Sequence, residues 1–220
     1  MSTHKFNSAS SVKELLRRVE FTSKARYNGA RRLALHNIFS QWTLAYLAVG
    51  QIAISLIPAL KLHNNFSEQY TNFGSIFFGV LVLAYSLLLG MGNFSSRSVV
   101  MHSCGMELGN LARELHLLNQ TPDVSEGKYE SVSKEYYQIL AKCENHAHQD
   151  YMATNASIGT AELDWPPSIT IKYVAKLISA AYAVSSSAIL KILHFAHYLA
   201  TIAMMSFWFF CMVKSSGYPA

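Results

Sequence analysis

Long stretches without a charged side chain constrain this chain more than any other feature of its sequence. No Asp, Glu, Lys or Arg occurs in residues 33–60, 69–96 or 192–213. Each stretch can hold the roughly 20 apolar residues that cross the hydrocarbon core of a bilayer. Only 14% of the chain is charged, whereas a soluble domain carries about 25%. The sequence therefore predicts an all-α membrane protein.

The first two apolar stretches are joined by a short polar loop and are expected to form a transmembrane helical hairpin. The first span is predicted over residues 39–60 and the second over residues 73–93, with the loop at residues 61–72. Trp42 and Tyr46 lie at the start of the first span, where aromatic side chains favour the membrane interface. The third stretch could span the membrane, lie on its surface or pack against the hairpin.

Four segments follow from this pattern. Residues 1–36 are predicted to form a basic amphipathic helix that starts at Ser11, with Glu14 completing a capping box. Residues 37–96 hold the two-span hairpin, and residues 97–167 form a helical body that ends in a loop over residues 153–168. Residues 168–220 form a C-terminal helix that contains the third apolar stretch.

The helical body shows two apolar seams with the alternating spacing of three and four residues that is typical of paired helices. We expect an antiparallel helical hairpin, packed within one chain or between subunits. The seams comprise Met101, Cys104, Leu108, Leu111, Leu115 and Leu118 in the first helix, and Tyr129, Val132, Tyr136, Ile139, Cys143, His146 and Asp150 in the second.

The distribution of positive charge predicts the orientation in the membrane. Sixteen of the 18 Lys and Arg residues lie in residues 1–36 and 97–191. Because positive residues mark the cytoplasmic side, the N-terminus and residues 97–191 are expected to be cytoplasmic in a bacterial inner membrane. Acidic residues are mixed into the second segment, so no direct nucleic-acid binding is expected.

Several polar or small residues within the apolar stretches are candidates for function. Gln51, Ser55, Ser86, His194 and His197 could line a pore in an oligomer, or could form hydrogen bonds between helices. A second group has the four-residue spacing that lets membrane helices approach closely, and it comprises Ser75, Gly79, Ser86 and Gly90.

No catalytic motif is present, and neither an enzymatic activity nor a cofactor is expected. The chain lacks the GxSxG, HExxH, P-loop and GxGxxG patterns. Cys143, His146 and Asp150 would suit zinc if His102 or Cys104 joined them. We favour a buried, hydrogen-bonded His and Asp and predict no metal site. The odd number of cysteines argues against a disulfide framework.

A family resemblance comes from two stretches. One is ARYNGARRL before the first span, with Arg26, Arg31 and Arg32. The other is YQILAKCENHAHQDY, which contains Asn145, His146, Asp150 and Tyr151. Together with the hairpin they resemble the SMODS and SLOG-associating two-transmembrane effectors, in particular a branch with a C-terminal extension that can accompany reverse transcriptases. The four motif positions are expected to be structural.

The resemblance implies a bacterial antiphage effector that oligomerises and permeabilises the membrane when a partner detects infection. Its expected partners are the lipid bilayer, further copies of itself, and a nucleotide-sensing or reverse-transcriptase protein. Two alternatives remain open at this point: a non-conducting membrane anchor that recruits a cytosolic protein, and a lipid-embedded enzyme.

Overall fold

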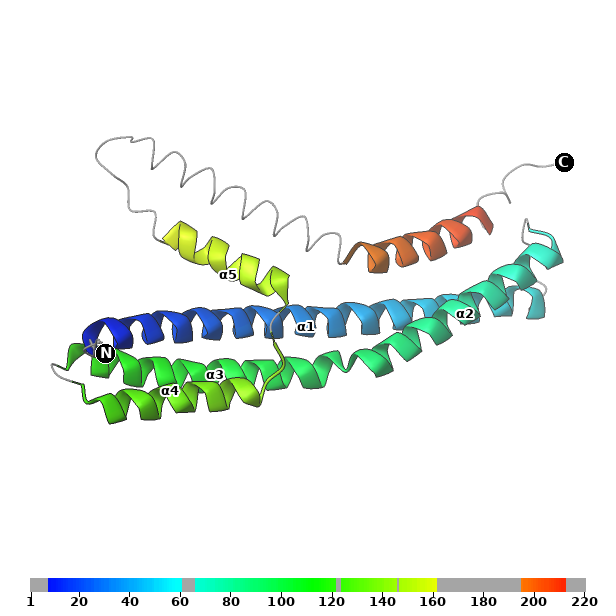
Figure 1. Cartoon of the computed structure of the whole chain (residues 1–220). Helices are drawn as coiled ribbons and strands as arrows, with labels where there is room; N and C mark the ends of the chain where they lie inside the picture. Colours follow the sequence, from blue (N-terminus) through cyan, green and yellow to red (C-terminus); the bar gives the residue numbers. More distant parts are fainter. Residues whose placement is uncertain (1–7, 61–65, 122–123, 146, 162–194, 213–220) are drawn as a thin grey trace, which may run out of the picture. The chain divides into compact units, whose positions relative to one another are not determined.

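The structure is a computed structural model that describes residues 8–60, 66–121, 124–145, 147–161 and 195–212. Within these ranges the elements are helices and no strand is found, which confirms the predicted all-α fold. Five helices carry labels in Figure 1, namely α1 (Ser8–Ala59), α2 (Glu68–Gly92), α3 (Phe94–Gln120), α4 (Glu126–Ala141) and α5 (His148–Ala161). A further helix, Phe195–Met212, follows near the C-terminus.

Three helical stretches are long and apolar enough to cross a membrane, as the sequence predicted. They are Ala9–Ala59, Glu68–Gln120 and Phe195–Met212. Many of their large apolar side chains are exposed, among them Val49, Ile76 and Leu83. Exposed apolar area of this extent needs an apolar surrounding, and a bilayer supplies one.

The chain divides into two compact units, and each of the three boundaries between them lies within two residues of the edge of a charge-free stretch. The first unit contains Met1–Leu33 and Ser95–Leu190, and the second contains Ala34–Phe94 and Lys191–Ala220. Helix α1 therefore contributes its first part to one unit and its second part to the other. The charged residues among those described lie in the first unit, except Glu68 at the start of α2.

The core of the first unit is formed by α1, α3 and α4. The predicted seam of α3 is buried from Met101 to Leu115. It packs with Val12, Leu15, Leu16 and Val19 of α1 and with Val132, Tyr136 and Ile139 of α4. Helices α3 and α4 are antiparallel, because Lys128 pairs with Glu114 at 2.7 Å and Lys142 pairs with Glu107 at 3.2 Å.

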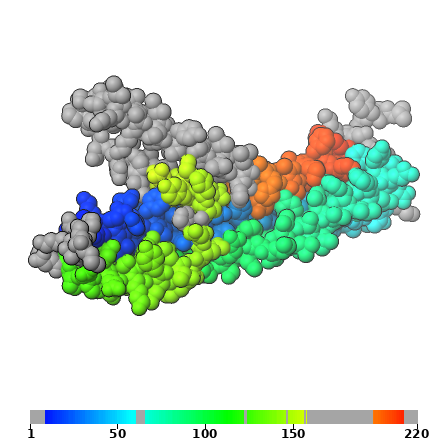
Figure 2. Space-filling view, viewed as in Figure 1, coloured from blue at the N-terminus to red at the C-terminus, as the bar shows by residue number. Residues whose placement is uncertain are grey.

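The core of the second unit is formed by α1, α2 and the helix Phe195–Met212. Its buried members are Leu47, Ile54, Phe78, Tyr85, Tyr198, Met205 and Met212. The third apolar stretch thus packs against the hairpin, one of the alternatives that the sequence left open. Figure 2 shows this C-terminal helix in orange and red beside the cyan residues of the hairpin.

Glycines let the C-terminal helix approach its neighbours. A Cβ added at Gly74 of α2 would lie 2.7 Å from Nε1 of Trp208, and one added at Gly50 of α1 would collide with Met205. By contrast, a Cβ at Gly90 would meet no described atom within 4 Å.

Several local predictions are wrong. Ser11 is not an N-cap, because α1 already begins at Ser8. Residues 153–161 are helical and belong to α5. The second seam does not run through one helix, since α4 ends at Ala141 and α5 begins at His148. The predicted end of the second span at residue 93, by contrast, agrees with the structure, in which Asn93, with a left-handed φ of 43°, separates α2 from α3.

Replacing Gly74 with alanine should loosen the C-terminal helix. The added methyl group overlaps the Trp208 ring, and overpacking of this kind costs about 1–3 kcal/mol. We expect a lower midpoint in thermal unfolding of the full chain in detergent. Gly90→Ala is the matched control, and its midpoint should stay equal or rise because alanine favours a helix. Equal midpoints for both variants would contradict the packing described.

Candidate functional site

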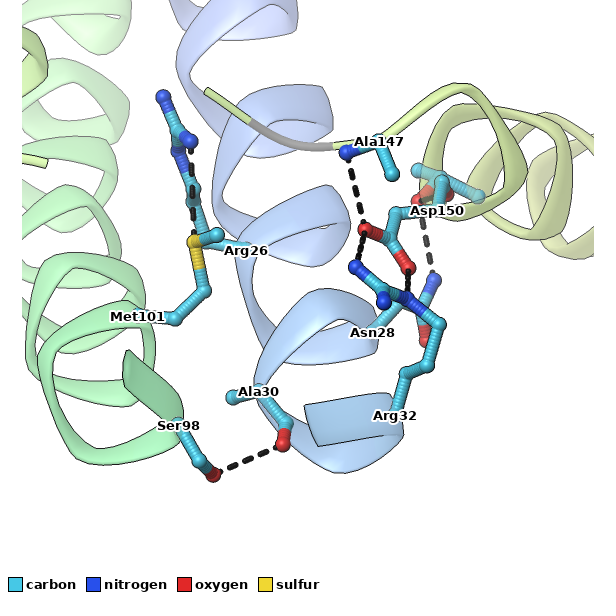
Figure 3. A network of polar contacts seen from close by, with 9 residues as sticks. Arg26, Asn28, Ala30, Arg32, Ser98, Met101, Ala147 and Asp150 are labelled. Carbon is cyan, nitrogen blue, oxygen red and sulfur yellow. Dashed lines mark hydrogen bonds and ion pairs between the residues drawn. The ribbon is translucent and has the colours of Figure 1, made fainter. Parts of the chain in front are cut away.

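The two stretches that carry the family resemblance meet in the first unit, at an ion pair between α1 and α5. Arg32 Nε lies 3.0 Å from Asp150 Oδ1, and Arg32 Nη2 donates to Asp150 Oδ2 at 3.0 Å (Figure 3). The two parallel bonds match the planar fork of a guanidinium to a carboxylate. The side chain of Asp150 is only 3% exposed and that of Arg32 is 17% exposed, so water screens this pair poorly.

Asp150 also caps the N-terminus of helix α5. Its Oδ2 accepts a hydrogen bond of 3.1 Å from the backbone N–H of Ala147, which precedes the helix. An acidic side chain in the first turn satisfies one of the unpaired N–H groups there and interacts favourably with the helix dipole. The carboxylate of Asp150 therefore both caps the N-terminus of α5 and attaches this helix to α1.

Two neighbouring residues of α1 complete the contact. Asn28 Nδ2 donates to Thr154 Oγ1 at 2.9 Å, and Thr154 is buried one turn after Asp150. Gly29 lies between the two polar contacts, and a Cβ there would be 3.2 Å from Asp150 Oδ2. Asn28 thus supplies a hydrogen-bond donor to α5, and the missing side chain of Gly29 leaves the space in which α5 can pack close to α1.

Two further arginines hold the segment between α4 and α5. Arg26, which is 2% exposed, donates from Nη1 to the carbonyl oxygen of Glu144 and contacts Met101 Sδ at 3.6 Å. Arg97 pairs with the carboxylate of Glu144 at 3.0 Å. The backbone before α5 is therefore fixed from α1 and α3 by charged donors.

Helix α5 is attached by polar contacts rather than by an apolar face. Its buried residues, where side chains are described, are Asp150 and Thr154, and none of its residues belongs to either apolar core. Tyr151 adds a ring contact with Phe21 at 5.1 Å. A helix held in this way buries little apolar surface that would oppose its release, so we infer that α5 is the most readily detached of the described helices in the first unit.

The motif residues named from the sequence differ in their surroundings. Asp150 is buried at the ion pair, whereas Tyr151 and Asn145 are exposed. His146 lies outside the described residues. The sequence did not indicate that Arg32 and Asn28 are the partners of α5, because no pattern of spacing connects residues more than a hundred positions apart.

The structure brings several of the other candidates together in the second unit. Gln51 Nε2 donates to Ser75 Oγ at 2.9 Å, and the hydroxyls of Ser55 and Ser75 are 3.2 Å apart. Gly79 lies beside Gln51, whereas Ser86 and Gly90 are exposed further along α2. His197 is exposed on the C-terminal helix, and His194 lies outside the described residues.

Cys104 and Cys143, which were considered above as zinc ligands, pack in and against the core of the first unit. Burial raises the pKa of the Cys104 thiol to about 12, and the neighbouring Cys143 adds to this shift. No group of three metal-ligating side chains is found among the described residues.

These features define a class of protein: an all-α membrane protein in which a polar helix is attached to a charged helical body. The chain belongs to the SMODS and SLOG-associating 2TM effector domain family 5, whose model matches residues 8–212. The family name describes a membrane effector that associates with other modules. Searches of curated proteins and of solved structures gave no match.

Charge exchange should test the attachment of α5. Arg32→Asp and Asp150→Arg each place like charges together, and each should increase amide exchange across residues 148–154 by at least tenfold. The double variant restores opposite charges and should recover part of the protection. Recovery should be incomplete because the arginine introduced by Asp150→Arg cannot accept the Ala147 N–H bond. Hydrogen–deuterium exchange on the full chain measures this, with Arg113→Asp as a control away from the pair; unchanged exchange in both single variants would refute the attachment.

The Cys104 thiol should resist alkylation. A thiolate is the reactive form, and with a pKa of about 12 this form is scarce at pH 8. In the wild-type chain, maleimide should modify Cys104 at least tenfold more slowly in the folded state than in denaturant, with the Cys104 peptide resolved from those of Cys143 and Cys211. Equal rates, followed by mass spectrometry, would show that the thiol is accessible and ionised.

Proposed function

We propose that this chain is a bacterial defence effector that assembles into an oligomer and permeabilises the inner membrane after a signal from a partner. The observation that carries the proposal is the polar contact of Gln51, Ser55 and Ser75 between the two helices of a largely apolar hairpin. Polar side chains at membrane depth are costly and usually face a protein interior or a water path. The family membership supports the effector role.

Assembly is needed because the described part of one copy offers no lumen. The three helices of the second unit enclose a core filled by Leu47, Ile54, Phe78 and Met205. A path for ions must therefore form between copies. Ser86 and Gly90 are exposed on α2, and small residues at this spacing let helices from two copies approach closely.

The amide of Gln51 supports this arrangement further. Its Nε2 is bonded to Ser75, but its Oε1 is buried and has no hydrogen-bond partner among the described residues. An unpaired buried acceptor costs about 1–3 kcal/mol. Rotation of this side chain toward a neighbouring copy or toward water in an assembled pore would satisfy the oxygen.

The proposed topology places the N-terminus and residues 97–191 in the cytoplasm, on the basis of their positive charge. A cytoplasmic partner could then reach the first unit, where α5 is attached mainly by polar contacts. We propose a nucleotide-sensing protein or a reverse transcriptase as this partner. Displacement of α5 is the step that the partner would control.

The test is membrane potential in bacteria that express the chain together with its natural genomic neighbours, read with a potential-sensitive dye during phage infection. Wild-type protein should depolarise the cells. Gln51→Leu should remove most of the signal because the polar contact is lost, and Gly90→Leu should do so because the added side chain blocks contact between copies.

Matched variants separate assembly from folding. Gly90→Leu adds a side chain where one copy has open space, so its amount in the membrane should equal that of wild type. Val80→Leu changes an exposed apolar residue of the same helix and should depolarise as wild type does. No depolarisation by wild-type protein in infected cells would favour the non-conducting anchor.

A further inference from the structure

The second unit contains a cavity of about 320 Å³ that the pore proposal does not use. We call it the aromatic cavity, because five of its lining residues have rings: His36, Tyr85, Phe94, His197 and Tyr198. They come from α1, α2, the first residue of α3 and the C-terminal helix. The volume lies at the lower end of the range for small-molecule sites, about 300–1,000 Å³.

The break between α2 and α3 shapes this cavity. Asn93 has the left-handed conformation, with φ 43° and ψ 35°, which Asn tolerates better than most residues. Phe94 follows directly, and its ring stacks on His36 with centroids 5.4 Å apart. Phe195 stacks on the same imidazole at 4.4 Å. A continuous helix would place Phe94 differently, so the break is what forms this wall.

The polar groups of the cavity are hydroxyl and imidazole groups that can form hydrogen bonds. The Tyr198 hydroxyl lies 3.2 Å from His36 Nδ1, and the Tyr85 hydroxyl lies 2.7 Å from Thr201 Oγ1. His197 stacks on Tyr85 and Tyr198, and its ring makes no hydrogen bond within the described part of the chain. No Asp, Glu, Lys or Arg is among the described residues that line the cavity. These residues therefore offer a charged ligand no carboxylate, ammonium or guanidinium group as a counter-ion.

The cavity is lined on one side by residues that are otherwise exposed on α2. Leu88 is 59% exposed and Met91 is 81% exposed, and both also line the cavity. In a membrane these side chains face lipid, so a ligand dissolved in the bilayer can enter past them. A strongly water-soluble ligand has no such route.

We propose that the aromatic cavity binds an uncharged, lipid-soluble ring compound with carbonyl oxygens, of the quinone class. Ring faces on the ligand suit offset stacking on Tyr85 and His197. A carbonyl oxygen accepts a hydrogen bond from the imidazole N–H of His197, since an imidazole carries at least one N–H donor. A plain hydrocarbon chain would leave this donor without an acceptor and would not match the ring-lined wall.

Binding is measured with purified full-length protein in lipid nanodiscs, so the result does not depend on whether the chain forms a pore. The probe is decylubiquinone, and the readout is saturable binding by equilibrium dialysis after subtraction of uptake by empty nanodiscs. Leu89→Trp fills the cavity from its lining, and His197→Phe keeps a ring but removes the donor. Leu83→Trp adds the same bulk at an exposed position of α2 outside the cavity.

Wild-type protein should show one saturable site. Leu89→Trp should weaken it at least tenfold, and His197→Phe should weaken it about fivefold, the loss of one hydrogen bond of about 1 kcal/mol. Leu83→Trp should bind as wild type does. The proposal is overturned if no saturable site exists, if Leu89→Trp binds as well as wild type, or if decane competes as well as the quinone, which would identify a site for lipid chains.

Discussion

Helix α1 is the element on which both cores depend. One face of its first part carries Val12, Leu15, Leu16 and Val19 into the first unit, and Leu47 and Ile54 of its second part enter the second unit. The chemistry of the helix changes at Leu33, after which no charged residue occurs until Lys61. A single helix thus meets two different requirements, a charged and hydrogen-bonded face in one unit and an apolar surface in the other.

The helices that bury apolar side chains were the ones predicted from the sequence. The three charge-free stretches and the seam from Met101 to Leu115 are visible because the spacing of apolar residues directly reflects the buried face. Helix α5 was missed in its second half because its buried positions are Asp150 and Thr154, and such a face produces no apolar period. The second span was predicted to end at Asn93, but the left-handed conformation of this residue was not predicted, since one residue with an unusual φ leaves the composition of the flanking helices unchanged.

The candidate site was predicted in part. Asp150 and Tyr151 were selected from the motif, but the partner of Asp150 could not be identified, because the stretch ARYNGARRL holds three arginines and sequence alone does not rank them. The structure distinguishes two of these: Arg32 forms the bidentate pair, and Arg26 is buried against Glu144 and Met101. In the second unit the sequence likewise selected Gln51 and Ser75 but not the hydrogen bond that joins them.

The fit of the C-terminal helix against glycines has a consequence for how that helix can move. Trp208 occupies the space above Gly74, and Met205 occupies the space above Gly50. A shift along the helix axis would carry both large side chains onto neighbouring residues that have a Cβ, and the contacts would clash. Steric clashes of Trp208 and Met205 therefore oppose a translation of this helix along its own axis. If this helix changes position during activation, it must separate sideways from α1 and α2, and that motion would expose the buried polar groups of Tyr85 and Thr201 at once.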